Sequence, residues 1–312
     1  MPNRRRNWTL VFAAVAASGF AAAAADWIEP RYQPAVGSRW IIQRDLFKEE
    51  RRNENGVASL RKNILRITSE LTIEGKTAEG FRLAYRRTQS SYESEDTDAP
   101  AMRASLAALE NVLVRAAADA SGKPLRVENL EDVRKAVGKM IDRLAAAGEN
   151  PQVAAAVRKL FSRLTKIDAA QAAEELLDEL PALALTQNTG LHPGEMRRRE
   201  VEEPSGIGPP LVKTIALSIA SADPASGDVR FRLEEHIDPD SILRFLAAVA
   251  SQLGRDPNDL KKMEIALDGK TDIEVSGGMT RALHRHSTTS SNLLGNTVVI
   301  ADRKEVTVRP AQ

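Results

Sequence analysis

Two long stretches of this sequence alternate polar and apolar residues, and only β-strands place successive side chains on opposite faces. The first stretch runs from Ser38 to Tyr92 and holds three segments. The pair Asn55-Gly56 separates the first two, and Asn-Gly is a strong hairpin signal. Long strands with charges on one face predict an antiparallel sheet wetted on one side. The apolar positions are Trp40, Ile42 and Leu46, interrupted by Arg44, then Leu65, Ile67, Leu71 and Ile73, then Phe81, Leu83 and Tyr85.

The same alternation returns in the second half of the chain. One strand is expected at 195–201, and residues 211–220 and 229–236 form a hairpin across the turn at 223–227. The last fifty residues predict three to five further strands. Their apolar positions are Ile265, Ile273, Val275, Val298, Ile300, Val306 and Val308.

Helices separate these two β-rich parts. Residues 99–108 have helical spacing behind Asp98, a candidate N-cap, and a hairpin through Ser121-Gly122-Lys123-Pro124 follows them. The central insert, about 129–180, predicts three helices, and a further helix is expected at about 240–253. The three helices of the insert begin at Asn129, at Asn150-Pro151 and near Asp168, and the third ends before Pro181.

This order predicts an α+β protein with a large, curved, half-barrel-like antiparallel sheet, because hairpin-length turns join most strands. We expect residues 26–312 to form a single domain, in which strands from both ends of the chain join one sheet and the helices cover its concave face. A division into two domains near residue 190 is the alternative.

The N-terminal 25 residues have the composition of a secretory signal peptide. Arg4, Arg5 and Arg6 precede an uncharged stretch from Thr9 to Ala25, and an Ala run then meets Asp26. This stretch is too short and too rich in alanine for a membrane anchor, and no later apolar run approaches spanning length. We expect cleavage after Ala25 and export to the periplasm or the medium.

Composition excludes several functional classes. The chain has no cysteine, which excludes disulfides, thiolate metal sites, cysteine nucleophiles and a lipid-modified N-terminal cysteine. The chain has 44 Lys and Arg against 43 Asp and Glu, and the leader removes three arginines, so the mature net charge is −2. This near-neutral balance, with only 4% aromatic residues, does not favour nucleic-acid binding.

Three short motifs have simple structural interpretations. Gly75-Lys76-Thr77 and Gly269-Lys270-Thr271 end like phosphate-binding loops but lack the earlier glycine, and both are interpreted as hairpin turns. Ser59 and Lys62 have the spacing of a serine–lysine pair, yet on a strand they point to opposite faces. The run Arg197-Arg198-Arg199 is followed by Glu200, Glu202 and Glu203, which favours a solvated edge strand over an anion site.

His284 and His286 are the strongest candidates for metal chemistry. On a strand they share one face and would meet the same zinc or copper ion, but the sequence supplies no evident third ligand. A solvated strand face is the competing interpretation. No motif nominates a catalytic, cofactor-binding or metal-binding residue.

Several segments together resemble exported bacterial proteins that have a large antiparallel sheet and a helical insert. Their order is also similar to that of periplasmic lipoprotein carriers, which implies a half-barrel that holds acyl chains beneath helices. The resemblance covers much of the mature chain in element order, and no functional residue can be carried over from it. The segments are Gly37-Ser38-Arg39-Trp40, 114–133, Leu191-His192-Pro193-Gly194-Glu195 and 271–284.

We therefore expect an exported, non-enzymatic binding or envelope-associated protein. Its partner would be a lipid or other apolar small molecule held between sheet and helices, or an envelope protein. An open groove of several hundred Å³ would favour a carrier, whereas a packed interior would favour a structural module. The alternative is an exported metal-assisted hydrolase that uses His284 and His286.

Overall fold

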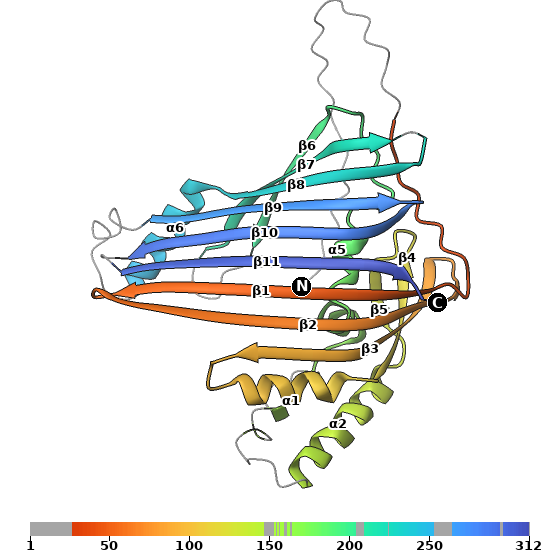
Figure 1. Ribbon diagram of the computed structural model, residues 1–312, viewed down its shortest axis with the longest axis horizontal. Coiled ribbons are helices and arrows are strands. Elements are labelled where there is room, and N and C mark those ends of the chain that lie inside the picture. The colour runs from red at the N-terminus through yellow and green to blue at the C-terminus, as the bar shows by residue number, and fades with distance from the viewer. Residues whose placement is uncertain are drawn as a thin grey trace, which may run out of the picture.

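One antiparallel sheet of eleven strands organises the molecule, as a computed structural model shows (Figure 1). The strands follow the order β5-β4-β3-β2-β1-β11-β10-β9-β8-β7-β6. The sheet is open, with β5 and β6 at its two edges. The structure describes residues 27–146, 153, 155, 157–158, 161–162, 164–203, 209–223, 225–252, 264–293 and 296–311.

Two meanders, one from each end of the chain, make up this sheet. The first consists of β1 (Arg39–Glu54), β2 (Val57–Lys76), β3 (Gly80–Ser94), β4 (Leu113–Asp119) and β5 (Pro124–Val127). The second consists of β6 (Met196–Glu203), β7 (Leu211–Asp223), β8 (Asp228–Ile237), β9 (Glu264–Ser276), β10 (Met279–Leu293) and β11 (Asn296–Pro310). Antiparallel pairing of β1 with β11, from Trp40 opposite Pro310 to Asn53 opposite Thr297, joins them.

Local turn chemistry explains the longest hairpin. Asn55 and Gly56 have φ angles of 53° and 81°, the left-handed pair that a type I′ turn requires. The turn matches the twist of its strands, so β1 pairs with β2 along its whole length, from Arg39 opposite Thr72 to Glu54 opposite Val57. The expected α+β class, with a large open antiparallel sheet and a helical insert, is confirmed.

The helices whose bounds the described residues give lie outside the sheet: α1 (Ala99–Leu109), α2 (Leu130–Ala146), α4 (Ala169–Leu176), α5 (Leu180–Leu183) and α6 (Pro239–Gln252). In Figure 1, α5 and α6 lie behind the strands, and α1 and α2 lie beyond β3. Residues 153, 155, 157, 158 and 161, in the region of the second expected helix, are also helical. No helix in the described ranges has the length and apolarity needed to cross a bilayer.

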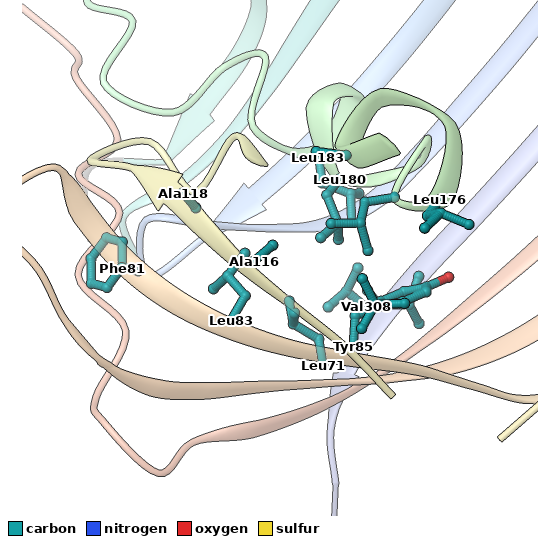
Figure 2. Close-up of a cluster of buried hydrophobic side chains, with 14 of the residues drawn as sticks. Leu71, Phe81, Leu83, Tyr85, Ala116, Ala118, Leu176, Leu180, Leu183 and Val308 are labelled. Carbon is teal, nitrogen blue, oxygen red and sulfur yellow. The ribbon is translucent and has the colours of Figure 1, made fainter. Parts of the chain in front are cut away.

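The main core forms where α4 and α5 pack on one end of the sheet (Figure 2). Alternate residues of the strands, such as Ile42 in β1 and Val308 in β11, are 1% and 4% exposed and meet Leu176 and Leu180 from above. We call this side of the sheet the helix-bearing face. The opposite side, which carries most of the cross-strand ion pairs, is the charged face.

A second, smaller cluster occupies the helix-bearing face near the other end of the strands. There Ile242 and Leu246 of α6 are buried against Leu211, Ile237 and Ile265 of the sheet. The insert and α6 therefore cover different parts of the same face, and a stretch of sheet lies between them.

Some sequence expectations need correction. Gly269-Lys270-Thr271 is not a hairpin turn but lies in the middle of β9. A glycine stands there because the neighbouring strand β8 brings Glu235 close: a Cβ added to Gly269 would lie 3.3 Å from Glu235 Cβ. Asp98 precedes α1 but its side chain makes no capping hydrogen bond. The third helix of the insert begins after Asp168 and ends before Pro181, as expected, because α4 ends at Leu176; Pro181 lies in a separate short helix, α5, that begins at Leu180 and was not expected.

Two further expectations concern the N-terminal segment and the number of domains. The signal peptide at 1–25 lies outside the described residues. The prediction of a single domain at 26–312 stays a prediction, although strands from both halves of the chain share one sheet.

Candidate functional site

A row of five side chains crosses the helix-bearing face where the core ends. The antiparallel register places Arg285 opposite Lys304, Lys304 opposite Leu46, Leu46 opposite Leu65, and Leu65 opposite Tyr92. Directly opposed residues of neighbouring strands lie on the same face of a sheet. The row, which we call the groove row, therefore changes from cationic on β10 and β11 to apolar on β1, β2 and β3.

The groove row lines a hollow of about 440 Å³, which we call the groove. The groove lies between two covered regions of the face: along β9, Ile273 belongs to the main core, Leu267 lines the groove, and Ile265 packs on the α6 cluster. The other lining residues are Phe47, Lys48, Asn63, Leu267, Ser287, Thr289, Asp302 and Arg303.

A buried polar network closes the core end of the groove. Arg44 of β1, 4% exposed, donates from Nη1 to Asp178 Oδ2 at 2.6 Å and lies 3.1 Å from Glu179 Oε2. The Tyr85 hydroxyl donates to Glu179 Oε1, and Ser69 Oγ lies 2.8 Å from that hydroxyl. These contacts tie the start of α5 to β1, β2 and β3.

Burial dominates the ionisation of this network. It raises the pKa of Glu179 above its usual value, and the neighbouring Asp178 carboxylate acts in the same direction, although Arg44 opposes both. Burial also acts to raise the pKa of Asp178, but Arg44, a hydrogen bond from Glu179 and Arg87 together outweigh it, and the pKa is lowered. Burial also raises the pKa of Tyr85, so the hydroxyl stays a hydrogen-bond donor at neutral pH.

Lys304 is the charged residue of the groove row whose charge is least balanced by nearby carboxylates. Burial lowers the pKa of its amine, and Arg44 lowers it further, while Asp178 and Glu179 act in the opposite direction. Arg44 and Arg87 contact these carboxylates directly, Arg44 both of them and Arg87 Asp178 at 3.7 Å. Within the part of the chain that the structure describes, Lys304 forms no salt bridge.

Arg285 is the second cation of the row. Its Nη2 donates to Glu235 Oε2 at 2.9 Å, whereas its Nε is buried and has no hydrogen-bond partner among the described residues. The contact reaches from β10 to β8 across β9, and Gly269 is the β9 residue opposite Glu235. The absence of a side chain at Gly269 gives the Glu235 side chain room to lie there.

The charged face is different at the same place. Its hollow, of about 480 Å³, includes Phe47, Ile64, Lys62 and His286, and the Arg303 guanidinium stacks 4.4 Å from the centre of the Phe47 ring. Cross-strand ion pairs such as Arg232–Asp272, with Nε and Oδ1 3.0 Å apart, cover this face farther along the sheet. It is a solvated, self-compensated surface.

His284 and His286 both lie on this charged face, side by side on β10 as the period-two spacing predicts. His284 is opposite Glu305 of β11 and Asp272 of β9, and His286 is opposite Arg303 and Lys270. Within the described residues, no group of three or more His, Asp or Glu side chains could hold a metal ion.

The other motifs fall where their simpler interpretations place them. Gly75 and Lys76 end β2 before the turn into β3, and the Arg197-Arg198-Arg199 run lies on the edge strand β6. Ser59, opposite Arg52, and Lys62, opposite Glu49, point to different faces of β2.

Sequence reasoning missed the groove row. Its signal was present, because Arg44 interrupts the apolar alternation of β1, and Asp302 and Lys304 interrupt that of β11 between Ile300 and Val306. A charged residue at a position where the alternation calls for an apolar one indicates a partly buried charge, which needs partners on neighbouring strands. Only the pairing of β1 with β11 shows that Lys304 lies opposite Leu46, one position along the face from Arg44, and that Asp302 lies opposite Lys48.

No protein-family model and no curated protein matches this chain. Among solved structures it is similar to lipovitellin, described with its lipid–protein interactions, at 12% identity and a TM-score of 0.42 over 89% of this chain; the chain spans 26% of the lipovitellin length. An outer membrane channel from Pseudomonas putida F1 has 9% identity and a TM-score of 0.20, over 90% of this chain and 98% of the channel. Ail, the attachment invasion locus protein of Yersinia pestis, has 6% identity and a TM-score of 0.15, over 88% of this chain and 100% of Ail. With every TM-score below 0.5, no function is carried over from these proteins.

Proposed function

We propose that this chain is an exported, non-enzymatic binding protein that holds an apolar small molecule in the groove of its helix-bearing face. The supporting observation is the half-covered state of that face. The insert buries one part and α6 another, and the groove between them is lined by Leu46, Leu65, Tyr92 and Leu267, all of them partly exposed.

The size and lining of the groove support a small-molecule ligand. Small-molecule sites are typically concave, 300–1,000 Å³ in volume, and mostly apolar with a few polar groups. The groove, at about 440 Å³, lies within this range. Burying the exposed parts of its leucine side chains under an apolar ligand would be favourable by about 25 cal/mol per Å² of apolar surface removed from water.

The helix-bearing face is favoured over the charged face because of what surrounds each hollow. The groove adjoins the main core and the α6 cluster, so an apolar ligand placed there would extend an existing apolar surface. The hollow on the charged face holds Lys62, His286 and an Arg303 already stacked on Phe47. Its apolar residues Phe47 and Ile64 belong to neither hydrophobic cluster, so an apolar ligand there would extend no existing apolar surface.

Adjacent residues of β2 test this assignment. Leu65 lines the groove and Ile64 lines the hollow on the charged face, and both are partly exposed on the same strand. We expect Leu65→Gln to weaken binding of the uncharged dye N-phenyl-1-naphthylamine at least about fivefold, since it places an amide against the apolar ligand. Fluorescence titration of delipidated protein gives the affinity.

The matched variant Ile64→Gln should bind the dye as the original protein does. Loss of dye binding in Ile64→Gln with retention in Leu65→Gln would move the site to the charged face. No dye binding by the original protein at its solubility limit would contradict the proposed function itself.

A further inference from the structure

The two ends of the groove row differ in charge, and binding of an apolar molecule alone does not explain this difference. Arg285 and Lys304 lie on one side, and Leu46, Leu65 and Tyr92 on the other. Three strand spacings separate Lys304 on β11 from Tyr92 on β3, roughly 14 Å at about 4.8 Å each. This length suits an extended alkyl chain that lies across the strands.

The polar end has more positive than negative charge. Two cations lie there, Arg285 and Lys304, against one carboxylate, Glu235. Nearer the core, Arg44 and Arg87 are matched by Asp178 and Glu179. The row directly outside is balanced, because Lys48 lies opposite Asp302. The surplus is therefore located at the groove row and not spread over the face.

Two donors at this end are without acceptors in the described structure. One is the Lys304 amine, which makes no salt bridge there. The other is the buried Nε of Arg285. Lys304 is partly buried and burial disfavours its charged form, so an anion that accepts from its amine would stabilise that form.

Resting on the proposed function, we propose that the ligand is an amphiphile with one anionic headgroup and an alkyl chain. Its headgroup lies between Lys304 and Arg285, and its chain crosses Leu46, Leu65 and Tyr92. Lys304 is the residue that selects the charge of the headgroup, because its neighbours Arg44 and Arg285 already contact carboxylates of the protein. Leu65 and its neighbours bind the chain whatever the headgroup.

Decanoate and decan-1-ol separate these two contributions, because they have the same chain and differ in headgroup charge. Isothermal titration of the delipidated protein should give an affinity about tenfold higher for decanoate, as expected of one charge-assisted hydrogen bond. In Lys304→Met this ratio should fall to about one, with the affinity for decan-1-ol unchanged. Lys304→Arg, which keeps the charge, should retain a preference for decanoate.

Lys62→Met is the matched control, because Lys62 lines the hollow on the charged face. It should keep the full decanoate preference. Equal binding of both ligands by the original protein, or a preference that survives in Lys304→Met, would overturn the headgroup assignment and leave the apolar site intact. Binding of neither ligand would instead contradict the proposed function, so the two failures are distinguishable. Retained decan-1-ol binding in each variant shows that the variant is folded.

Discussion

Glu179 is the residue whose environment departs most from that of an ordinary surface carboxylate. Its side chain is completely buried and is held by Tyr85 and Arg44. A buried ion pair is weak support for net stability, but removing one partner strands the other in a medium of low dielectric constant. Glu179 therefore acts chiefly as the group that fixes the start of α5 on the sheet.

Glu179→Ala should lower the free energy of unfolding by about 3 kcal/mol, because Tyr85 and Arg44 then lose an acceptor inside the protein. Urea unfolding followed by circular dichroism measures the change. Glu93→Ala is the control, since Glu93 is 60% exposed in its ion pair with Arg66 and should cost less than about 1 kcal/mol. Equal losses in the two variants would contradict the role of Glu179.

The pH dependence of stability gives a second prediction for the same residue. The folded pKa of Glu179 is raised above the ordinary 4.5, so the folded protein binds its proton more tightly than the unfolded chain. Its contribution to stability is therefore largest below pH 4.5 and declines as the pH rises from there toward the folded pKa. Asp178, with a lowered pKa, acts in a separate window: its contribution is lost as the pH falls below about 3.8.

Glu179→Gln should remove the pH dependence of stability above pH 4.5 that Glu179 causes, and should leave that of Asp178 below about pH 3.8. The original protein should lose stability between pH 4.5 and neutral relative to the variant, so the difference between the two free energies should change with pH in this range. Urea unfolding at a series of pH values tests this. A difference that stays constant from pH 4.5 to 7 would show that Glu179 titrates normally.

At the scale of single elements, α4 depends on the N-cap residue that precedes it. Asp168 forms a capping box: its carboxylate accepts hydrogen bonds from the backbone N–H groups of Ala170 and Gln171, and the Gln171 side chain bonds back to the backbone of Asp168. The cap directs Ala173 and Leu176 into the main core. Loss of this cap would loosen the insert against the sheet.

Asp168→Ala should cost about 1 kcal/mol of stability, the usual value of an N-cap. Asp98→Ala offers a matched comparison, because Asp98 occupies the same position before α1 but makes no capping hydrogen bond. We expect it to be close to neutral. Thermal unfolding of both variants measures the difference, and a loss for Asp98→Ala as large as that for Asp168→Ala would contradict this account of α4.

The elements differ in how much of them was predictable. Asn55-Gly56 and Asp168 act through their immediate neighbours, so their turn and cap follow from local sequence. Gly269 was misread because a glycine in a strand looks like a turn until the residue that needs its space, Glu235 on another strand, is known. The groove row was beyond reach for the same reason: no local pattern places Lys304 beside Leu46.

At the scale of the whole molecule, the pairing of β1 with β11 decides cooperativity. These strands place Ile42, Val306 and Val308 in one core with Val114 from the first meander and Phe231 from the second. Separating the halves of the chain would break this core and expose two new sheet edges. We therefore expect residues 26–312 to unfold as one unit.

Urea unfolding of residues 26–312 should give coincident transitions by tryptophan fluorescence and by circular dichroism. Two separate transitions, or a stable fragment ending near residue 190 after limited proteolysis, would support the two-domain alternative.

Binding on the helix-bearing face is tested most directly by a crystal structure of the protein with 10-bromodecanoate, whose bromine is located by anomalous scattering. The carboxylate should lie within hydrogen-bond distance of Lys304 Nζ, with the bromine over β2 or β3 near Leu65 and Tyr92. A bromine on the charged face near Phe47 and Ile64, or none in crystals soaked to saturation, would contradict this account.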